Sequence, residues 1–388
     1  MKKIKPAQIV NVVLIVVSTM VLLWMLNLMG FSAFCRWVPF YNSIFVGLWL
    51  FDLLILILFI LSILKLKKEK ITKIFKLVSL ILSSIFTLIM LGSFIFLVSP
   101  GLSKVESGYT LNELGNNTLI NSEGPISLAV ASDPHWGSER SNKEARQQII
   151  KNIGSSNYDA FLCLGDISEM GSTEANYKTA VKAFQENLNE TPLHVVLGNH
   201  DALINGTGVF KKYFQKDKEN FYNRIDLEGL HIITLNLLWD AEEFDKTQKQ
   251  WLIEQLEDIS QDDITIVLSH CFGYSSGYLD QDTGKNWFDN PDVIEEVDSL
   301  IEKYNVELMI SGHNHLMELL KHENTHYAVI GTMGGILDSV SNYTSPQSIW
   351  MNNQTYGWLD IQVYQNYLEL TYKDQSGKDI YKATLDNN

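Results

Sequence analysis

The residues best suited to chemistry in this sequence form five short clusters rich in aspartate, asparagine and histidine. These clusters contain Asp133, His135, Asp166, Asn199, His200, Asp201, His270, His313 and His315. Carboxylate and amide oxygens mixed with imidazoles suit divalent Mn, Fe or Zn, and cysteine takes no obvious part. A single tetrahedral ion would not use so many ligands, whereas two ions bridged by a carboxylate would. Two ions about 4 Å apart polarise a phosphoryl group and activate water, so the clusters indicate phosphoester hydrolysis.

Each cluster of ligands follows a short apolar run that we predict to be a buried strand. Four helices are predicted between these runs, a strand pair over Phe221–Asn236, and further strands in the tail. The five runs are Ile126–Ser132, Ala160–Leu164, Leu193–Leu197, Ile264–Ser269 and Val306–Ile310; the helices are Lys143–Ile153, Thr173–Leu188, Asp245–Asp258 and Pro291–Tyr304; the tail strands are Tyr327–Ile330, Gly357–Gln365 and Tyr367–Tyr372. Ligands bind at the carboxyl ends of strands in open α/β sheets, so we expect the five clusters to meet in space.

The motifs in these clusters resemble those of the calcineurin-like metallophosphoesterases. They read Asp133-Pro134-His135, Gly165-Asp166, Gly198-Asn199-His200-Asp201, His270 and Gly312-His313-Asn314-His315. Any one motif is weak alone, but all five occur in order, each after a predicted strand. The resemblance covers roughly residues 126–335. It implies a four-layer α/β/β/α sandwich with two facing sheets, in which the C-terminal strands complete the second sheet.

The resemblance also implies a role for each motif residue. Asp133, His135 and His315 would hold a first metal ion, and Asn199, His270 and His313 a second, with Asp166 bridging the two. A hydroxide between the ions would attack phosphorus in line. His200 would stabilise charge or protonate the leaving oxygen, and Asp201 would orient His200. For Asp133 or Asp166 considered alone, the alternative is a helix cap.

One departure from the family pattern bears on the substrate. Many members carry a second aspartate three positions after the bridging one, and protein phosphatases follow it with arginine; here Glu169 and Met170 stand at those places. The glutamate can keep a hydrogen bond to a ligand, while the missing arginine argues against a protein phosphatase.

Aromatic residues in loops near the motifs are candidates for lining a substrate cleft. Trp136, Tyr274 and Trp287 are the ones we select, and Trp136 is the strongest because it directly follows His135. The alternative is that these rings pack loops onto the domain.

The first 98 residues differ sharply in composition from the rest. Three apolar stretches, about residues 7–29, 43–64 and 77–98, are each long enough to cross a bilayer as a helix. We therefore predict a membrane anchor over residues 1–98, a linker over 99–125 and a metallophosphoesterase domain over 126–388. Asp52 lies within the second stretch, and its purpose is left open.

Lysines predict the orientation of the anchor. Lys2, Lys3 and Lys5 precede the first stretch, six more fill the loop between the second and third, and only Arg36 lies between the first and second. The positive-inside rule then puts the N-terminus in the cytoplasm. We therefore predict a multi-pass cell-membrane protein. Its three spans would contact the lipid bilayer, and its catalytic domain would lie outside the cytoplasm.

The charge of the remaining chain restricts its partners. Of 30 basic and 45 acidic residues, ten basic and two acidic lie in the first 98, so the rest carries a formal charge of −23. This argues against nucleic acid as a partner and disfavours an exonuclease of the same family. We predict hydrolysis of an envelope or lipid-linked phosphoester, diester or monoester. The alternative from another class is a non-catalytic membrane sensor that retains the fold. Metal identity and oligomeric state stay open.

Overall fold

The computed structural model describes residues 6–30, 39–64, 69–102, 110–116, 118, 124–204, 206–216, 219–260, 262–280, 284, 286–339 and 342–386. The chain divides into two compact units, Met1–Ser103 and Lys104–Asn388, and each is described by itself. About half of the predicted linker, residues 103–109, 117 and 119–123, lies outside the described residues.

The first unit consists of three long apolar helices: α1 (Pro6–Gly30), α3 (Pro39–Ile63) and α4 (Glu69–Leu102). Each contains a window long and apolar enough to cross a membrane, at Pro6–Trp24, Val46–Ile63 and Lys70–Ile95. Apolar side chains on the outside of the bundle are exposed, which suits contact with lipid; Leu50 is 62% exposed and Leu88 is 70% exposed. Length and composition therefore suggest membrane association.

Polar side chains join the three helices inside this bundle. Asp52 of α3 is buried and accepts hydrogen bonds from the Ser18 and Thr19 hydroxyls of α1, at 3.2 and 2.7 Å. Asn11 of α1 donates to Ser79 of α4 at 2.9 Å and accepts from the Ser83 hydroxyl at 2.6 Å. Hydrogen bonds of this kind hold helices together where water is excluded. Asp52 therefore has a packing role in the structure.

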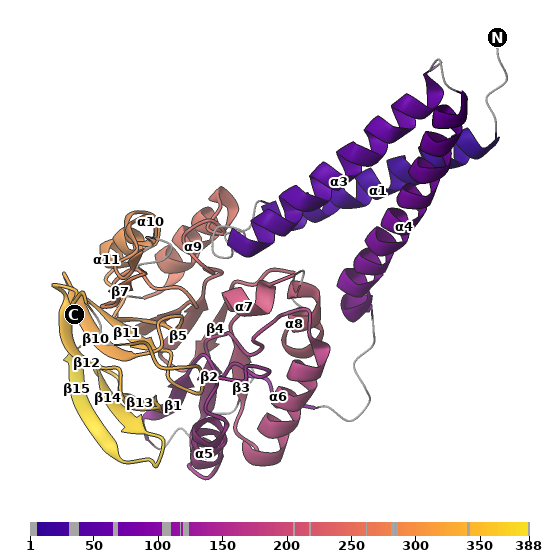
Figure 1. Ribbon diagram of the computed structural model, residues 1–388. Coiled ribbons are helices and arrows are strands. Elements are labelled where there is room, and N and C mark those ends of the chain that lie inside the picture. Colours follow the sequence, from indigo (N-terminus) through magenta and orange to yellow (C-terminus); the bar gives the residue numbers. More distant parts are fainter. Residues whose placement is uncertain are drawn as a thin grey trace. The chain divides into compact units, whose positions relative to one another are not determined.

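The second unit is built on two large sheets (Figure 1). The first has strand order β15-β14-β13-β1-β2-β3 and the second β12-β10-β11-β9-β6-β5-β4, while β7 and β8 form a separate hairpin. The strands are β1 (Ile126–Ala131), β2 (Ala160–Cys163), β3 (Leu193–Val195), β4 (Asn223–Leu227), β5 (Leu230–Thr234), β6 (Ile264–Leu268), β7 (Tyr278–Leu279), β8 (Asn286–Trp287), β9 (Leu308–Ser311), β10 (Met317–His322), β11 (Thr325–Ile330), β12 (Ser348–Asn352), β13 (Gly357–Val363), β14 (Tyr367–Asp374) and β15 (Asp379–Asp386).

The main hydrophobic core lies between the two sheets. Side chains alternate along a strand, so one set from each sheet faces the other sheet. Leu128 and Val130 of β1 join Ile266 and Leu268 of β6 in this core. The intervening Val267 packs instead on the outer side, with residues of the helices that cover the second sheet. The strands are buried on both faces, which explains why their sequences read as continuous apolar runs.

Helices cover the outer faces and complete the four-layer α/β/β/α sandwich (Figure 1). Phe161 of β2 meets Phe184 of α6, with ring centroids 6.1 Å apart, on the outer side of the first sheet. Leu252, Val297 and Ile301 pack on the outer side of the second. The helices are α5 (Lys143–Gly154), α6 (Glu174–Asn187), α7 (Asn199–Ala202), α8 (Thr207–Phe214), α9 (Lys246–Asp258), α10 (Pro291–Val293), the π-helix η1 (Ile294–Asp298) and α11 (Ser299–Lys303).

The C-terminal strands differ from the prediction. β13 pairs antiparallel with β1, and β14 and β15 follow it outward, so all three extend the sheet of β1 to β3. The second sheet is completed instead by β10, β11 and β12. β13 carries Leu359 and Ile361 into the core between the sheets, and their burial favours pairing beside the central β1.

Candidate metal centre

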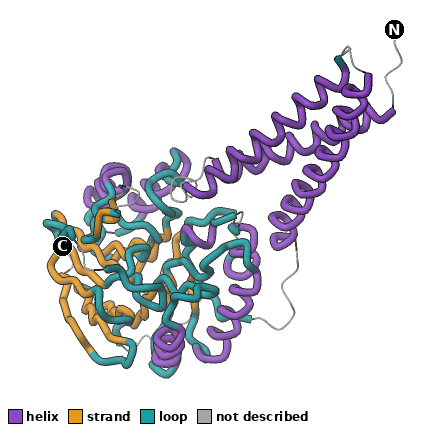
Figure 2. The backbone as a smooth tube through the Cα atoms, viewed as in Figure 1, coloured by secondary structure: helices purple, strands orange, loops and turns teal. Residues whose placement is uncertain are grey.

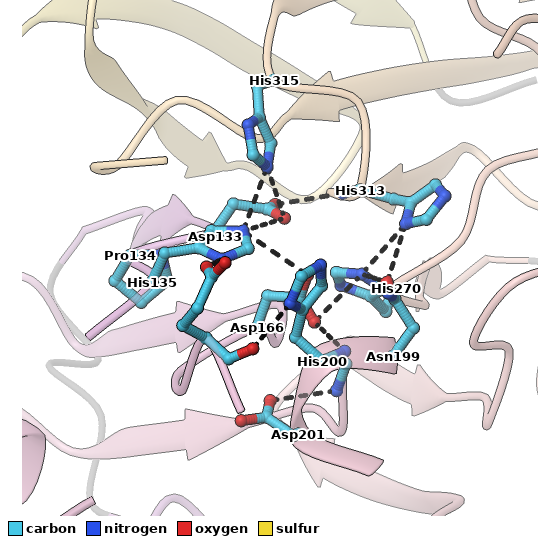
Figure 3. A network of polar contacts seen from close by, with 12 residues as sticks. Asp133, Pro134, His135, Asp166, Asn199, His200, Asp201, His270, His313 and His315 are labelled. Atoms are coloured by element: carbon cyan, nitrogen blue, oxygen red, sulfur yellow. Dashed lines mark hydrogen bonds and ion pairs between the residues drawn. The ribbon is translucent and has the colours of Figure 1, made fainter. Parts of the chain in front are cut away.

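Six of the seven predicted metal ligands lie in loops at the carboxyl ends of parallel strands, and Asn199 begins the short helix α7 that follows β3. Figure 2 shows how loops connect the strands and helices of this unit. The segments after β1, β2 and β3 come from the first sheet, and those after β6 and β9 from the second. They contribute Asp133 and His135, Asp166, Asn199, His270, and His313 and His315, respectively. Figure 3 shows these side chains pointing toward one another. Five of the seven are buried, and His313 and His315 are partly exposed.

One group of ligands surrounds His135. Its Nε2 lies 3.1 Å from Nε2 of His315 and 3.6 Å from Oδ1 of Asp133. Oδ2 of Asp166 lies 3.5 Å from the same Nε2. Asp133, His135 and His315 have ligand atoms within 4.8 Å of one another, as a metal site requires. These are the residues expected around the first ion.

A second group surrounds the side-chain oxygen of Asn199. This Oδ1 lies 2.7 Å from Nε2 of His270 and 2.8 Å from Nδ1 of His313. Oδ1 of Asp166 lies 3.5 Å from Nε2 of His270. Asp166 therefore turns one carboxylate oxygen toward each group, which is the arrangement that a bridging carboxylate needs.

Hydrogen bonds on the far side of the imidazole rings fix which nitrogen faces the centre. Nδ1 of His270 donates to the Leu164 carbonyl at 2.8 Å, and Nδ1 of His315 donates to the Ile336 carbonyl at 2.6 Å. Nδ1 of His135 lies 2.8 Å from Oε2 of Glu169. In each of these three rings Nε2 faces inward. Hydrogen bonds at the outer nitrogen orient histidine ligands in the same way at metal sites. Glu169 thus makes the hydrogen bond to a metal ligand that the sequence analysis expects.

The backbone at several ligands has an unusual conformation. Asp133, His135, Asp166 and His313 have φ values of 62°, 47°, 51° and 69°. This left-handed region is costly for residues other than glycine and concentrates at functional sites. The folded sandwich therefore holds these four side chains at some cost in backbone strain.

The glycine of the Gly198-Asn199 motif allows two loops to approach closely. A Cβ atom at Gly198 would lie 2.2 Å from the backbone nitrogen of Asp166 and 2.3 Å from its Oδ1. Any side chain here would displace Asp166, which accounts for a glycine at this position.

The site concentrates opposite charges away from water. Burial alone would lower the pKa of His135, but hydrogen bonds with Asp133 and Glu169 raise it to about 10. Burial likewise opposes protonation of His270, yet the nearby Asp166 carboxylate raises its pKa to about 9. Burial and the neighbouring His270 lower the pKa of His313 to about 3. A cation could therefore take the place of protons held by His135 and His270.

An unpaired carboxylate oxygen supports a fit to metal ions. Oδ1 of Asp133 is buried and has no hydrogen-bond partner among the described residues, and Oδ1 of Asn199 faces two imidazole nitrogens. Each residue has its acceptor oxygen beside imidazole nitrogens, as a ligand would. Carboxylates, imidazoles and one amide match the donors that divalent Mn, Fe or Zn accept. The residues present fit a pair of such ions.

Asp201 does not lie where its predicted role requires. Its carboxylate accepts hydrogen bonds from the backbone amides of Ile167, Ser168 and Gly198 and from the Tyr177 hydroxyl. The ring of His200 is oriented instead by the Glu169 carbonyl, which accepts from Nδ1 at 2.8 Å. The prediction that Asp201 orients His200 is corrected, because the buried amides of the Asp166 loop claim its oxygens.

His200 itself lies at the edge of the centre. Its backbone amide donates to Oδ1 of Asp166 at 2.8 Å. The rings of His200 and His135 have centroids 4.8 Å apart. Ligand atoms of His135, Asp166 and His200 fall within 4.8 Å of one another. Burial lowers the pKa of His200.

Only one of the three predicted substrate residues lies beside the metal ligands. Trp136 is buried against Phe184 and under the Arg146 guanidinium, so its ring serves packing. Tyr274 is buried and lies against His322, in a separate cluster with Tyr327. The ring of Trp287 is 5.3 Å from that of His313. Trp136 and Tyr274 therefore pack within the domain, which is the alternative given for these loop aromatics, because adjacency in sequence does not determine where a ring points.

Sequence reasoning missed residues that support the ligands from outside. Oδ2 of Asp338 accepts the His315 amide at 2.8 Å. Nδ2 of Asn314, between two ligands, donates to Ser275 Oγ at 2.9 Å and to the Trp287 carbonyl at 3.2 Å. The position of Asn314 inside a motif was the available signal. No local pattern marks Asp338.

Comparison with known proteins agrees with this geometry. The calcineurin-like phosphoesterase family matches residues 126–317. Purple acid phosphatase 22 of Arabidopsis thaliana is 24% identical over 212 residues, which cover 51% of this chain and 46% of the plant protein. Tartrate-resistant acid phosphatase type 5 of Sus scrofa is 22% identical over 289 residues, covering 65% of this chain and 82% of the pig protein. This chain thus spans about half the length of its plant relative.

A solved structure shares the fold of the second unit. A purple acid phosphatase from yellow lupin (Lupinus luteus) seeds superposes with a TM-score of 0.59 at 17% identity, over 69% of this chain and 55% of the lupin chain. The fold has two facing sheets, and seven ligands meet where strands of both sheets end. The family match over residues 126–317 leads to the same assignment. Residues 126–317 of this chain thus form a domain of the calcineurin-like phosphoesterase family.

Proposed function

We propose that the chain is a membrane-anchored hydrolase that uses two divalent metal ions to cleave phosphoesters. The observation that carries this proposal is the division of contacts around Asp166, whose two oxygens lie 3.5 Å from His135 and 3.5 Å from His270. Two bound ions would polarise the phosphoryl group and make water nucleophilic at neutral pH. Asp133, His135 and His315 would hold one ion, and Asn199, His270 and His313 the other.

Residues outside the ligand set do the remaining work. His200 would give the proton on Nε2 to the leaving oxygen, while the Glu169 carbonyl holds Nδ1 in place. A lowered pKa makes protonated His200 the stronger acid. Glu169 and Asp338 would fix the rings and loops that carry the ligands. Asp201 would keep the Asp166 loop in position.

The domain division is part of the proposal. Residues 1–98 would be the anchor, 99–125 the linker and 126–388 the catalytic domain. The lysines before α1 and between α3 and α4 would keep those segments in the cytoplasm. The catalytic domain would then act outside the membrane. Its substrate would be a phosphoester of the cell envelope, such as a lipid-linked one.

The test of hydrolysis uses the full chain in lipid nanodiscs. Turnover of bis-p-nitrophenyl phosphate and p-nitrophenyl phosphate is measured with Mn2+, with and without a chelator. We expect metal-dependent turnover, abolished by Asp166→Asn. The control is Asp262→Asn, the same charge change at an exposed residue before β6, at the strand end opposite His270. If neither ester is turned over, a non-catalytic sensor is the better explanation. The ratio of the two rates separates a diesterase from a monoesterase.

The orientation is tested separately. An Asp262→Cys variant in intact cells is treated with a membrane-impermeant maleimide, and the unsubstituted chain gives the background. We expect labelling without permeabilisation. Labelling only after the cells are opened would refute the extracytoplasmic placement and leave the hydrolase proposal standing.

A further inference from the structure

The β7–β8 hairpin lies directly against the loop that carries His313 and His315. Nδ2 of Asn314 donates to the carbonyls of Ser276 and Trp287, both at 3.2 Å. A Cβ atom at Gly277 would lie 1.5 Å from the Trp287 carbonyl oxygen, so the backbones meet without room for a side chain. The hairpin is therefore fixed in position relative to the metal ligands.

The hairpin carries aromatic rings to the edge of the second ligand group. The rings of Trp287 and Tyr278 are stacked, with centroids 6.0 Å apart and planes at 22°. Trp287 lies 5.3 Å from His313, and Trp239 lies 5.4 Å from the same ring. Trp239 is also 6.5 Å from the ring of His200. Trp239 and Trp287 thus form a wall of rings beside the second ligand group, and Tyr278 extends this wall by stacking on Trp287.

An exposed isoleucine follows the backbone that lies against the other ligand group. Ile336 is 45% exposed, and its carbonyl accepts the hydrogen bond from His315. The neighbouring Gly335 is so close that a Cβ atom there would lie 2.6 Å from Cε1 of His315. Exposed isoleucine is costly to leave in water, and beside a catalytic centre it offers apolar contact to a ligand. The backbone contact therefore brings an exposed aliphatic residue close to the first ligand group, as the rings lie close to the second.

The surroundings favour a hydrocarbon group over a nucleoside or a second charged group. Tyr278 already stacks on Trp287, with the ring planes at 22°, so that face of Trp287 is closed to a base. Carboxylates stand close by: Asp338 accepts the His315 amide, and Glu169 contacts His135. These charges would repel the further phosphates of a nucleotide.

Resting on the proposed function, we propose that this border is a subsite for the hydrocarbon part of the substrate. The ring wall of Trp239, Tyr278 and Trp287 and the Ile336 side chain would contact the aliphatic chain joined to the phosphoryl oxygen. The substrate class is accordingly an amphiphilic phosphoester whose organic group is an alkyl chain.

The test compares ethyl, butyl and hexyl phosphate as substrates of the full chain in nanodiscs with Mn2+. Full burial of one methylene favours binding by about fourfold, so partial burial of four more methylenes should raise kcat/KM by at least about tenfold from ethyl to hexyl phosphate. Ile336→Ser and Tyr278→Ser should each lower the hexyl-to-ethyl ratio by about threefold. Ile349→Ser is the matched control: Ile349 is 51% exposed and lies on β12, and its variant should keep the wild-type ratio.

A binding measurement tests the subsite independently of catalysis. Calorimetric titration with hexylphosphonate and ethylphosphonate should show the same preference for the longer chain, reduced in Ile336→Ser. Chain-length-dependent binding without turnover of these monoesters or of either p-nitrophenyl ester would support the subsite and overturn the hydrolase. Turnover with a hexyl-to-ethyl ratio near one, or faster turnover of adenosine monophosphate than of hexyl phosphate, would overturn the subsite and leave the hydrolase intact.

Discussion

Replacing Asp201 by alanine tests whether this residue acts in structure or in catalysis. Its carboxylate is buried and accepts four hydrogen bonds, at 3.1, 2.9, 3.2 and 2.8 Å. Three of the donors are backbone amides of the loops that carry Asp166 and Asn199. Removal would leave these donors buried without partners, so we expect the loops to lose their fixed positions.

The expected magnitude follows from the donors. A lost hydrogen bond costs about 1 kcal/mol, so four give about 4 kcal/mol. Burial of the charged carboxylate offsets part of the stabilisation from these hydrogen bonds, and it raises the pKa of Asp201 to about 7. We therefore expect a net loss of about 2 to 3 kcal/mol, which lowers Tm by about 4 to 12 °C for a domain of this size. Mn2+ affinity should fall as well.

The assay measures Tm, Mn2+ affinity and kcat for Asp201→Ala beside His200→Ala. The His200 variant should lose kcat while keeping Tm and metal affinity nearer to wild type. An Asp201→Ala protein with unchanged Tm and metal affinity but reduced kcat would refute the structural role. It would restore the interpretation in which Asp201 acts through His200.

Three further outcomes are expected. Glu169→Gln should weaken Mn2+ binding by about 10- to 100-fold in calorimetry, because the His135 ring loses its outer carboxylate; unchanged affinity would contradict this. Gly198→Ala should abolish Mn2+ binding, since its Cβ would lie 2.2 Å from the Asp166 nitrogen; a variant that binds both ions would show that the loops can separate. Burial first, and neighbouring acidic side chains second, raise the pKa of Glu243 from 4.5 to about 7. The folded protein binds this proton more tightly than the unfolded chain does, so the carboxyl costs stability as pH rises from 4.5 through 7. Glu243→Gln should remove that cost, and its Tm advantage over wild type should grow across this range to the equivalent of about 1 to 3 kcal/mol. A constant difference from pH 4.5 to 8 would refute the assignment.

The strands and helices that position the site were largely predictable from local pattern. The apolar run before Asp133 became β1, Ile126–Ala131, and the run before His270 became β6, Ile264–Leu268. Pairing between distant strands was not predictable, because β13 joins β1 through contacts that no local pattern encodes. The helix predicted over Pro291–Tyr304 is interrupted by a π-helical turn at Ile294–Asp298.

The site, like the fold, has features that the sequence predicts and features that it does not. Residue type and order predicted which seven side chains meet, because each cluster follows the carboxyl end of a strand; that these strands belong to two facing sheets was implied by the resemblance. Orientation was not predictable: Trp136 turns into the core against Phe184, and Asp201 turns toward backbone amides. Such choices depend on which buried donors lack a partner in three dimensions.

The ligands come from both sheets, with Asp133 after β1 and His315 after β9. Bound ions would therefore act as a cross-link between the two halves of the sandwich. No such site exists in an unfolded chain, where bringing these residues together would cost the entropy of closing a very long loop. Free metal would then favour the folded state by mass action, by about 2.7 kcal/mol at one hundred times the Kd. The supply of free metal around the protein would then help to determine how long each molecule survives.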